Sequence, residues 1–256
     1  MNPVARSPLL ELRGITKRFG AAQALSGVDL DVFAGEVLAL VGDNGAGKST
    51  LVKTIAGIFP PEGGEMRFGG VPIALRGPRD ATRLGIATVY QDLALCDNLD
   101  VVANLFLGRE ERATPSRMLD EEAMEKRALA VLHVLNVKLP SVRAAMGGLS
   151  GGQRQSVAVA RALMGEAKLV MLDEPTAALG VVQTTQVLEL ILRLKQQGLA
   201  VIVISHNLAD VFRVADRIVV LRQGRLVGDF ETHATARETV VGRITGADAG
   251  ATRGIA

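Results

Sequence analysis

The chain of 256 residues contains no tryptophan, one tyrosine and one cysteine. Its single thiol, Cys96, cannot form a disulfide within the chain, so a reducing, cytosolic setting is expected. Residues 1–8 lack the apolar stretch of a signal peptide, and no apolar run approaches the roughly 20 residues that cross a bilayer. If the protein works at a membrane, a partner must supply the part that spans it.

An excess of charge of one sign is also missing. The chain carries 29 Lys and Arg against 27 Asp and Glu, interleaved along its length, for a formal net charge of +2. Nucleic-acid binding depends on many contacts between basic side chains and phosphates, so this balance argues against a nucleic-acid partner. A chain of this length buries enough surface to fold without disulfides or a structural metal, as one large domain or one domain with a smaller insert.

Strand patterns occur in both halves of the chain. Residues 28–32 alternate apolar and acidic side chains, as in a half-buried strand, whereas Val37–Val41 is a continuous apolar run, as in a central parallel strand. A helix is expected from Gly47 to about Ala56, ended by Gly57. Further short strands are expected at residues 86–90, 169–172, 201–204 and 218–221.

The middle of the chain has a helical pattern instead. Asp120 suits the N-cap position of a helix, and Glu121 and Glu122 follow it where the helix dipole favours acids. We therefore predict an α/β fold with a core over about residues 8–92 and 166–246 and a helical insert over about residues 93–165. The small, Gly/Ala-rich residues 247–256 are expected to fray.

A glycine-rich loop stands between the apolar run and the expected helix, and it reads Gly42-Asp43-Asn44-Gly45-Ala46-Gly47-Lys48-Ser49-Thr50. It matches the phosphate-binding pattern G-x-x-x-x-G-K-[S/T], in which glycines let backbone N–H groups point at phosphate oxygens. The helix that follows presents its positive end to the same anion. In this pattern Lys48 reaches the β- and γ-phosphates and the Ser49 hydroxyl ligates Mg²⁺. A chance glycine-rich turn is the alternative, and the flanking strand and helix argue against it.

Two acids follow the apolar residues 169–172. Ligands of α/β sheets lie at the carboxyl ends of strands, so Asp173 is expected to hold Mg²⁺ and Glu174 to orient and deprotonate the attacking water. An acidic helix cap is the alternative for this pair alone. His206 follows another apolar strand and is a candidate for a hydrogen bond to the γ-phosphate, whereas His133 and His233 are expected to have no special role.

Leu149-Ser150-Gly151-Gly152-Gln153 is a second potential anion site, because it opens a helix with free N–H groups. Ser150 and Gln153 also fit a capping box, S-x-x-Q. A cap alone does not explain two adjacent glycines, which weaken a helix start unless backbone must approach another group closely.

This run resembles the signature motif of ATP-binding-cassette ATPases, and the resemblance extends from about residue 9 to 246. It implies a phosphate-loop core with an N-terminal antiparallel β subdomain, ATP and Mg²⁺ as ligands, and a head-to-tail dimer in which each signature closes on the ATP of the other copy. Gln91 then resembles the glutamine that senses Mg²⁺ and water, and His206 the switch histidine. Phe19 stands where an aromatic side chain usually stacks on adenine, although a packed core position is an alternative.

One departure from the family pattern concerns the residues after the catalytic acid. The family usually has Ser-Ala-Leu-Asp, and this chain has Ala177-Ala178-Leu179-Gly180. The aspartate that normally crosses the dimer interface is missing. ATP hydrolysis is expected to be retained, because Lys48, Asp173, Glu174 and His206 are present. The change puts in question how the two ATP sites communicate.

Residues 85–95 and 104–109 resemble simple-sugar importers of the ribose, xylose and fructose type, and the loop Gly42-Asp43-Asn44-Gly45 with Gly180 resembles a single-cassette subset. The resemblance implies an ATPase on the cytoplasmic face of a bacterial inner membrane, with permease subunits and, indirectly, an extracytoplasmic substrate-binding protein as partners. The residues around Gln91 and the insert helices would contact the permease. A lipid or drug exporter, a soluble protein of this family acting on ribosomes or DNA, and a regulatory form with little turnover are the alternatives.

Overall fold

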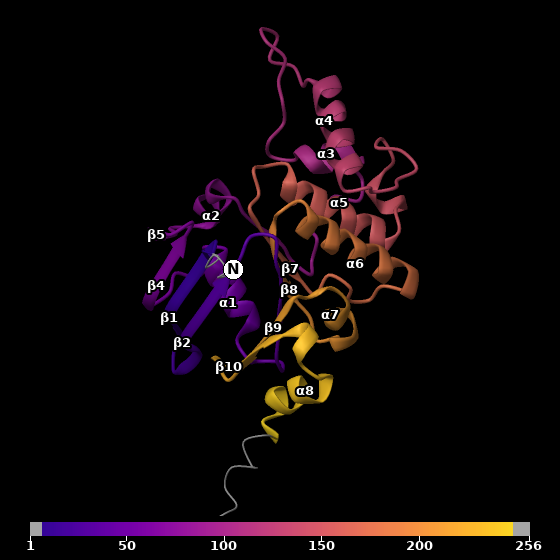
Figure 1. Ribbon diagram of the computed structural model, residues 1–256. Coiled ribbons are helices and arrows are strands. Elements are labelled where there is room, and N and C mark those ends of the chain that lie inside the picture. The colour runs from indigo at the N-terminus through magenta and orange to yellow at the C-terminus, as the bar shows by residue number, and fades with distance from the viewer. Residues whose placement is uncertain (1–6, 248–256) are drawn as a thin grey trace, which may run out of the picture.

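The computed structural model describes residues 7–247. Figure 1 shows a small sheet on one side, a larger sheet at the centre and a group of helices beyond it. The expectation that residues 1–8 are not a signal peptide concerns a segment of which residues 1–6 lie outside the described part, as do residues 248–256 of the expected frayed tail.

The central sheet has six strands in the order β10-β9-β3-β8-β7-β6. The strands β3, β6, β7, β8 and β9 pair in parallel, and β10 is antiparallel at the edge. Their bounds are β3 Val37–Val41, β6 Ile86–Val89, β7 Leu169–Asp173, β8 Ala200–Ile204, β9 Arg217–Arg222 and β10 Arg225–Glu231. The parallel α/β core expected from the sequence is therefore confirmed.

The second sheet is antiparallel, in the order β2-β1-β4-β5. Its strands are β1 Leu10–Phe19, β2 Ala22–Val32, β4 Gly63–Phe68 and β5 Val71–Ile73. The alternating residues 28–32 form the end of β2, where Val28, Leu30 and Val32 are buried and the acids between them are less so. This sheet matches the N-terminal antiparallel subdomain that the resemblance implies.

Eight α-helices are present among residues 7–247, and none of them is both long and apolar enough to cross a membrane. They are α1 Lys48–Ile55, α2 Pro78–Leu84, α3 Val101–Phe106, α4 Glu121–Val134, α5 Gly151–Leu163, α6 Val181–Gln196, α7 Leu208–Val214 and α8 Arg237–Thr245. Two short 3₁₀ turns, Met146–Gly148 and Thr232–Ala234, complete the described elements. The side chain of Asp120 accepts a hydrogen bond from the Ala123 N–H, so its predicted N-cap is confirmed.

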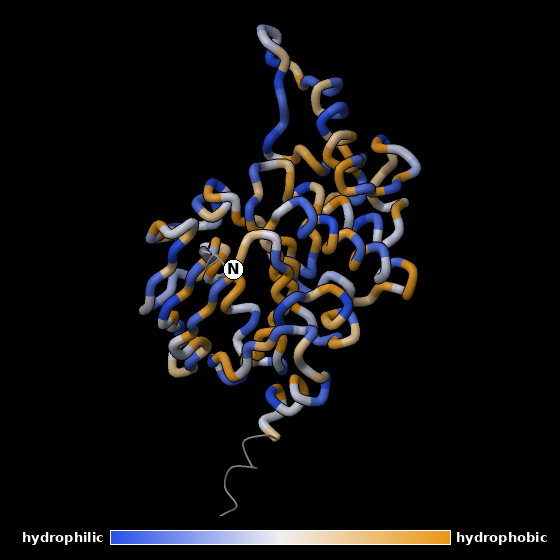
Figure 2. Tube along the Cα trace, in the orientation of Figure 1, coloured by the Kyte–Doolittle hydropathy of each residue, from blue (hydrophilic) through white to orange (hydrophobic). Residues whose placement is uncertain are grey.

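Both faces of the central sheet are buried, and β3 shows how. Val37, Ala39 and Val41 join one apolar cluster, whereas Leu38 and Leu40 join the other. Helices α5 and α6 cover the first face, and α1 covers the second with Leu51, Val52 and Ile55. Figure 2 shows hydrophobic residues concentrated along these central strands. Burial on both faces requires a continuous apolar run rather than an alternating one, so the sequence pattern of β3 follows from its position.

The segment between β6 and β7 is less helical than its sequence suggests. Residues 93–100 form no helix, and residues 107–120 form an extended hairpin in which Arg112 and Leu119 make an antiparallel bridge. The prediction of a helical pattern is therefore wrong for these residues. Gly108 has a left-handed backbone (φ 76°), and Pro115 has no N–H to donate, so neither favours helix continuation.

A buried ion-pair network joins the two sheets at one end. The Arg217 guanidinium contacts Glu36 Oε1 at 2.8 Å and Asp229 Oδ2 at 2.7 Å, and it also donates to the Asp31 carbonyl. The side chains of Arg217 and Glu36 are 11% and 8% exposed. These contacts tie β2, β9 and β10 to the turn before β3.

Removing Arg217 should destabilise the protein strongly. Arg217→Ala leaves Glu36 buried without its partner, and such a loss costs about 3–5 kcal/mol of the free energy of unfolding. Urea unfolding of the variant measures this cost. Arg67→Ala, which removes an exposed pair with Glu65, is the control and should change it by less than about 1 kcal/mol. Equal effects of the two substitutions would contradict the role of the network.

Candidate functional site

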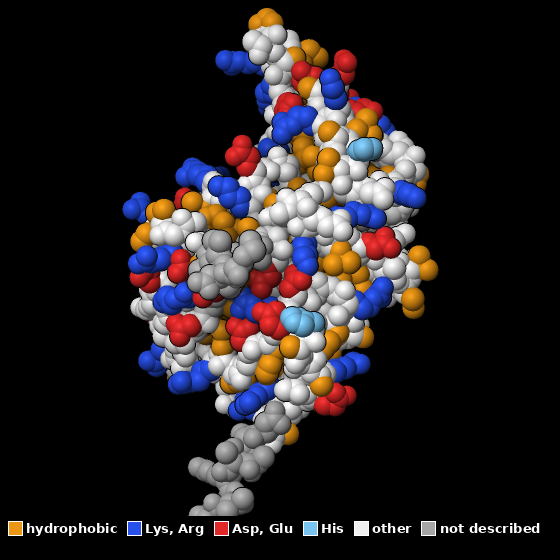
Figure 3. Space-filling model, viewed as in Figure 1, with side chains coloured by type: hydrophobic (Ala, Val, Ile, Leu, Met, Phe, Trp, Pro, Cys, Tyr) orange, Lys and Arg blue, Asp and Glu red, His pale blue; other side chains and the backbone are white. Residues whose placement is uncertain are grey.

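The predicted site residues converge because β3, β8 and β7 are parallel neighbours. Parallel strands end at one edge of the sheet, so the loop after β3, the acids at the end of β7 and the histidine after β8 meet there. In Figure 3, acidic, basic and histidine side chains lie together near the middle of the face shown, over β7 to β9. One cavity of about 300 Å³, the loop cavity, is lined by Lys48, Ser49, Gln91, Asp173 and Glu174.

The loop before α1 depends on its glycines. A Cβ at Gly42 would stand 2.1 Å from the Leu221 carbonyl oxygen, and one at Gly47 would stand 2.6 Å from that of Ala24. Both residues also have positive φ angles, 150° and 104°. No side chain caps α1 at Gly47, so its first N–H groups face the cavity without a side-chain acceptor. This is the arrangement that binds anions at helix N-termini.

Lys48 folds back over this loop. Its Nζ donates hydrogen bonds to the carbonyl oxygens of Gly42 at 2.6 Å and Asp43 at 2.9 Å. Burial lowers the pKa of the Lys48 ammonium, against the opposing charges of Glu174, Asp43 and Asp173. A desolvated cation whose hydrogen bonds within the described residues go to neutral carbonyl oxygens is poised to bind an anion, because an anionic partner compensates its burial.

The oxygen donors of the same cavity fit a magnesium ion. The Ser49 hydroxyl, the Gln91 side-chain amide and the Asp173 carboxylate all line it, and Mg²⁺ prefers such hard oxygen ligands. Burial and the neighbouring Glu174 raise the pKa of Asp173, against Lys53 and Lys48. A bound cation would relieve this cost of holding a buried carboxylate. The donor set is small, and Mg²⁺ commonly completes its coordination with substrate phosphates and waters.

Glu174 and His206 form a pair beside the loop. The His206 Nδ1 and the Glu174 Oε1 are 2.9 Å apart, and both residues line a second cavity together with Gly42, Gln91 and Ala177. Glu174 has a left-handed backbone (φ 50°), which is strained for a residue with a side chain. Its N–H donates to the Ile204 carbonyl, which holds this conformation at the strand end. The carboxylate is thereby fixed at the cavity edge, where it can accept a proton.

Asp210 supports this pair and was not predicted from the sequence. Its Oδ2 accepts hydrogen bonds from Thr176 Oγ1 at 2.8 Å and from Asn207 Nδ2 at 3.0 Å. It thus joins the segment after Glu174 to the segment after His206, and it is 7% exposed. In the sequence it is an acid in the first turn of a helix, which is a common arrangement, so no signal marked it.

The capping box at the start of α5 is confirmed. The Ser150 side chain accepts from the Gln153 N–H, and the Gln153 side chain accepts from the Ser150 N–H. The two glycines are also explained by close approach. A Cβ at Gly151 would lie 2.8 Å from Leu179 Cδ2, and one at Gly152 would lie 3.0 Å from Gln183 Cβ. The start of α5 therefore packs tightly against the residues that follow the acids of β7.

The structure does not bring every predicted residue to the loop cavity. Ser150, Gly151, Gly152 and Gln153 are not among its lining residues, and neither is Phe19. Phe19 is 44% exposed and meets Phe59 edge-on, with ring centroids 5.1 Å apart. The alternative of a packed core position for Phe19 is therefore wrong, and its ring is accessible to a ligand.

Gly180 is the N-cap residue of α6 and provides no side-chain cap. A Cβ at this position would meet the Oε1 of Gln183 at 2.7 Å, and that atom is the far end of a flexible side chain. The fold can thus accommodate the aspartate usual in the family if Gln183 rotates. The two residues that follow, Val181 and Val182, are 86% and 68% exposed.

Comparison with known proteins agrees with this geometry. The ABC transporter family model matches residues 25–177. The fructose import ATP-binding protein FrcA of Rhizobium meliloti is 49% identical over 87% of this chain and 88% of its own. The xylose/arabinose import ATP-binding protein XylG of Sulfolobus acidocaldarius is 46% identical over 93% of each chain.

The solved structures agree as well. The dimeric structure of MJ0796, a bacterial ABC transporter cassette, superposes with a TM-score of 0.73 and 26% identity, covering 88% of this chain and 100% of that one. The family model spans more than half of the chain, and the two import ATP-binding proteins match over most of both chains. The chain therefore belongs to the ABC transporter family, in which it is an ATP-binding cassette and an ATPase.

Proposed function

We propose that this ATPase powers the import of a simple sugar, of the fructose, ribose or xylose type, through a separate permease. The observation that carries the proposal is the near end-to-end match to two sugar import ATP-binding proteins, at 49% and 46% identity. The phosphate loop, acid pair and histidine support it, because they supply a complete set of hydrolytic groups at one edge of the sheet.

ATP is the substrate of the site. Its β- and γ-phosphates face the N–H groups at the start of α1, Thr50 among its residues, and the Lys48 ammonium. The loop around them is formed by Gly42, Asp43, Asn44, Gly45, Ala46 and Gly47. Ser49, Gln91 and Asp173 would hold Mg²⁺, which would neutralise phosphate charge when bound. Glu174 accepts a proton from the attacking water, and His206, 2.9 Å from Glu174, keeps that carboxylate oriented and contacts the γ-phosphate.

A second copy of the chain completes the site. The residues Ser150, Gly151, Gly152 and Gln153 offer a helix N-terminus but lie away from the chain's own phosphate loop, so they are available to the ATP of a partner copy. The dimeric form of the superposed cassette supports this arrangement. Phe19, exposed at the end of β1, stacks on the adenine ring.

The permease lies in the membrane, and this chain binds to its cytoplasmic face in a bacterial inner membrane. An extracytoplasmic substrate-binding protein delivers the sugar to that permease. The chain's contact with the permease is made by the residues after Gln91 and by the helices between β6 and β7, where a cavity of about 380 Å³ is open. ATP has to bind the closed dimer more tightly than the open one if binding is to drive the permease.

Affinity purification from gently solubilised membranes tests this assignment. A tagged chain should recover an integral membrane protein in stoichiometric amount, and the recovered complex should hydrolyse ATP faster when a candidate sugar and its binding protein are added. Recovery with ribosomes or DNA and without a membrane protein would leave the ATPase standing and overturn the transport function.

A further inference from the structure

The segment after Gln91 is held by side chains rather than by a strand or helix. Residues 91–98 belong to no described helix or strand. Buried Asn104 bonds the backbone N–H and carbonyl of Cys96, and Arg154 pairs with Asp97 at 2.7 Å. The position of Gln91 therefore depends on what holds the residues that follow it.

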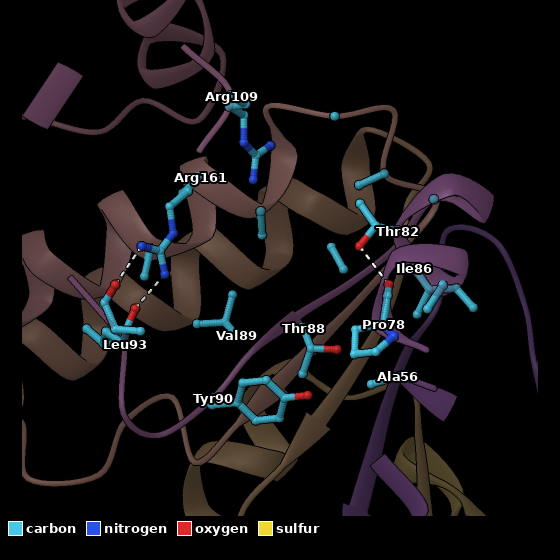
Figure 4. Close-up of a pocket in the computed structure, with 18 of the residues that line it drawn as sticks. Ala56, Pro78, Thr82, Ile86, Thr88, Val89, Tyr90, Leu93, Arg109 and Arg161 are labelled. Carbon is cyan, nitrogen blue, oxygen red and sulfur yellow. Dashed lines mark hydrogen bonds between the residues drawn. The ribbon is translucent and has the colours of Figure 1, made fainter. Parts of the chain in front are cut away.

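Arg161 on α5 makes two further contacts with this segment. Its Nη2 donates to the Leu93 carbonyl and its Nη1 to the Ala94 carbonyl, both at 2.7 Å (Figure 4). Burial, with the nearby charge of Arg109, lowers the pKa of this guanidinium. A half-buried guanidinium that faces two carbonyl oxygens holds them firmly, because losing either bond leaves a desolvated donor.

The backbone that Arg161 holds is strained. Ala94 has a φ of 47°, in the left-handed region that residues with a side chain seldom adopt. Such a conformation is energetically unfavourable, and it persists only where neighbouring contacts enforce it. Without Arg161, the segment 92–96 is expected to relax and Gln91 to lose its fixed position.

Arg161 also lies on the same helix as the signature residues. Ser150 caps α5, and Arg161 is eleven residues later, roughly 16 Å along the helix axis. A rigid helix that moves at its N-terminus moves Arg161 too, and with it the carbonyls of Leu93 and Ala94. The cavity of about 380 Å³ that Figure 4 shows is lined by Leu93, Ala94, Arg109 and Arg161, so an occupant of this cavity contacts the same segment.

We propose that Arg161 is a positioning residue that couples α5 to the Gln91 segment, so that engagement of the signature residues by nucleotide repositions Gln91. This inference rests on the proposed function for its dimer, in which the signature contacts the partner's ATP. Arg161 is not among the residues that line the phosphate-loop cavity. Its removal should therefore spare ATP binding and impair turnover.

Arg193 supplies a matched control. It lies on α6, and its Nη1 donates to the carbonyls of Leu135 at 2.9 Å and Asn136 at 3.4 Å. Arg193→Met thus also removes an arginine that is bonded to two backbone carbonyls, but these carbonyls lie outside the Gln91 segment. Arg193 in addition pairs with Glu189 at 3.3 Å. A merely structural role of Arg161 would make the two substitutions equivalent.

The single cysteine reports directly on the segment. Cys96 is the only thiol of the chain and is partly exposed, so its rate of modification by a thiol reagent measures how far the segment opens. The measurement is made on the purified chain in a Glu174→Gln background, with and without Mg-ATP. It needs no permease, so it stays informative if the transport function fails.

In the parental chain, Mg-ATP should change this rate several-fold. Without nucleotide, Arg161→Met should raise the rate of Cys96 modification by about tenfold, and Mg-ATP should no longer change that rate. The affinity of the variant for ATP should stay within about twofold of the parental value. Arg161→Lys, which keeps the charge but reaches fewer acceptors, should restore part of the response. In the Glu174-containing protein, kcat should fall in Arg161→Met while the KM for ATP stays near the parental value.

Three results would overturn the proposal. These are no effect of Mg-ATP on the parental rate, parental behaviour of Arg161→Met, or equal losses in Arg161→Met and Arg193→Met. Thermal unfolding shows whether each variant is folded. If Arg161→Met does not fold, Arg161→Lys decides, because a full parental response in that variant contradicts the need for two carbonyl contacts.

Discussion

Replacing Glu174 with glutamine should lower the rate of ATP hydrolysis by about 10²- to 10⁴-fold, which is the usual contribution of a positioned general base. Glutamine has the size of glutamate but no basic oxygen, so it cannot take the proton of the attacking water. Glu174 lines the loop cavity and lies 2.9 Å from His206, and the variant keeps both positions. Phosphate release at saturating Mg-ATP measures the effect.

ATP affinity should survive this substitution, because Lys48 and the loop N–H groups remain. Unhydrolysed ATP should then hold two copies together, which size-exclusion chromatography with Mg-ATP detects. Glu189→Gln removes an exposed carboxylate on α6 and serves as the control, with parental turnover expected. Parental turnover in Glu174→Gln itself would show that another group is the base.

Replacing Lys48 with alanine should weaken ATP binding by about 30- to 1,000-fold. The ammonium is the half-buried cation of the phosphate loop, and loss of one partner of a desolvated charge pair costs about 2–4 kcal/mol. The loop is also affected, since Nζ bonds the carbonyls of Gly42 and Asp43. Calorimetric titration with Mg-ATP, or with a slowly hydrolysed analogue, gives the change in Kd.

Lys126→Ala tests whether any loss of positive charge has this effect. Lys126 is an exposed residue on α4, and its removal should leave the Kd unchanged. Together the two site variants separate binding from chemistry: Lys48→Ala raises Kd, and Glu174→Gln lowers kcat. Unchanged affinity for ATP in Lys48→Ala would show that Lys48 does not bind the phosphates.

Local patterns predicted much of the fold. The apolar run 37–41 became a strand buried on both faces, and the caps at Asp120 and Ser150 have the hydrogen bonds that their side chains suggest. These features depend on neighbours within a few residues, which the sequence displays directly. Gly108 and Pro115 are a similar local signal against helix in residues 107–120, but this segment lies between two stretches with helical patterns, which favour helix across it.

Contacts between residues far apart in the sequence could not be predicted from local patterns. Arg161 meets carbonyls 67 and 68 residues away, and Asp210 meets Thr176 across 34 residues. An arginine within a helix or an acid at its start is ordinary, so neither stood out before the chain was folded. The exposure of Phe19 likewise follows from its place at the end of β1, where the chain turns into β2.

Uptake of labelled sugar tests the central claim most directly. The chain and its co-purified membrane partner are reconstituted in vesicles with the ATPase facing Mg-ATP, and fructose, ribose and xylose are offered on the opposite side with the binding protein. We expect accumulation of one of these sugars that requires ATP and disappears in Glu174→Gln. Hydrolysis that no sugar stimulates, with no sugar accumulated, would contradict the account.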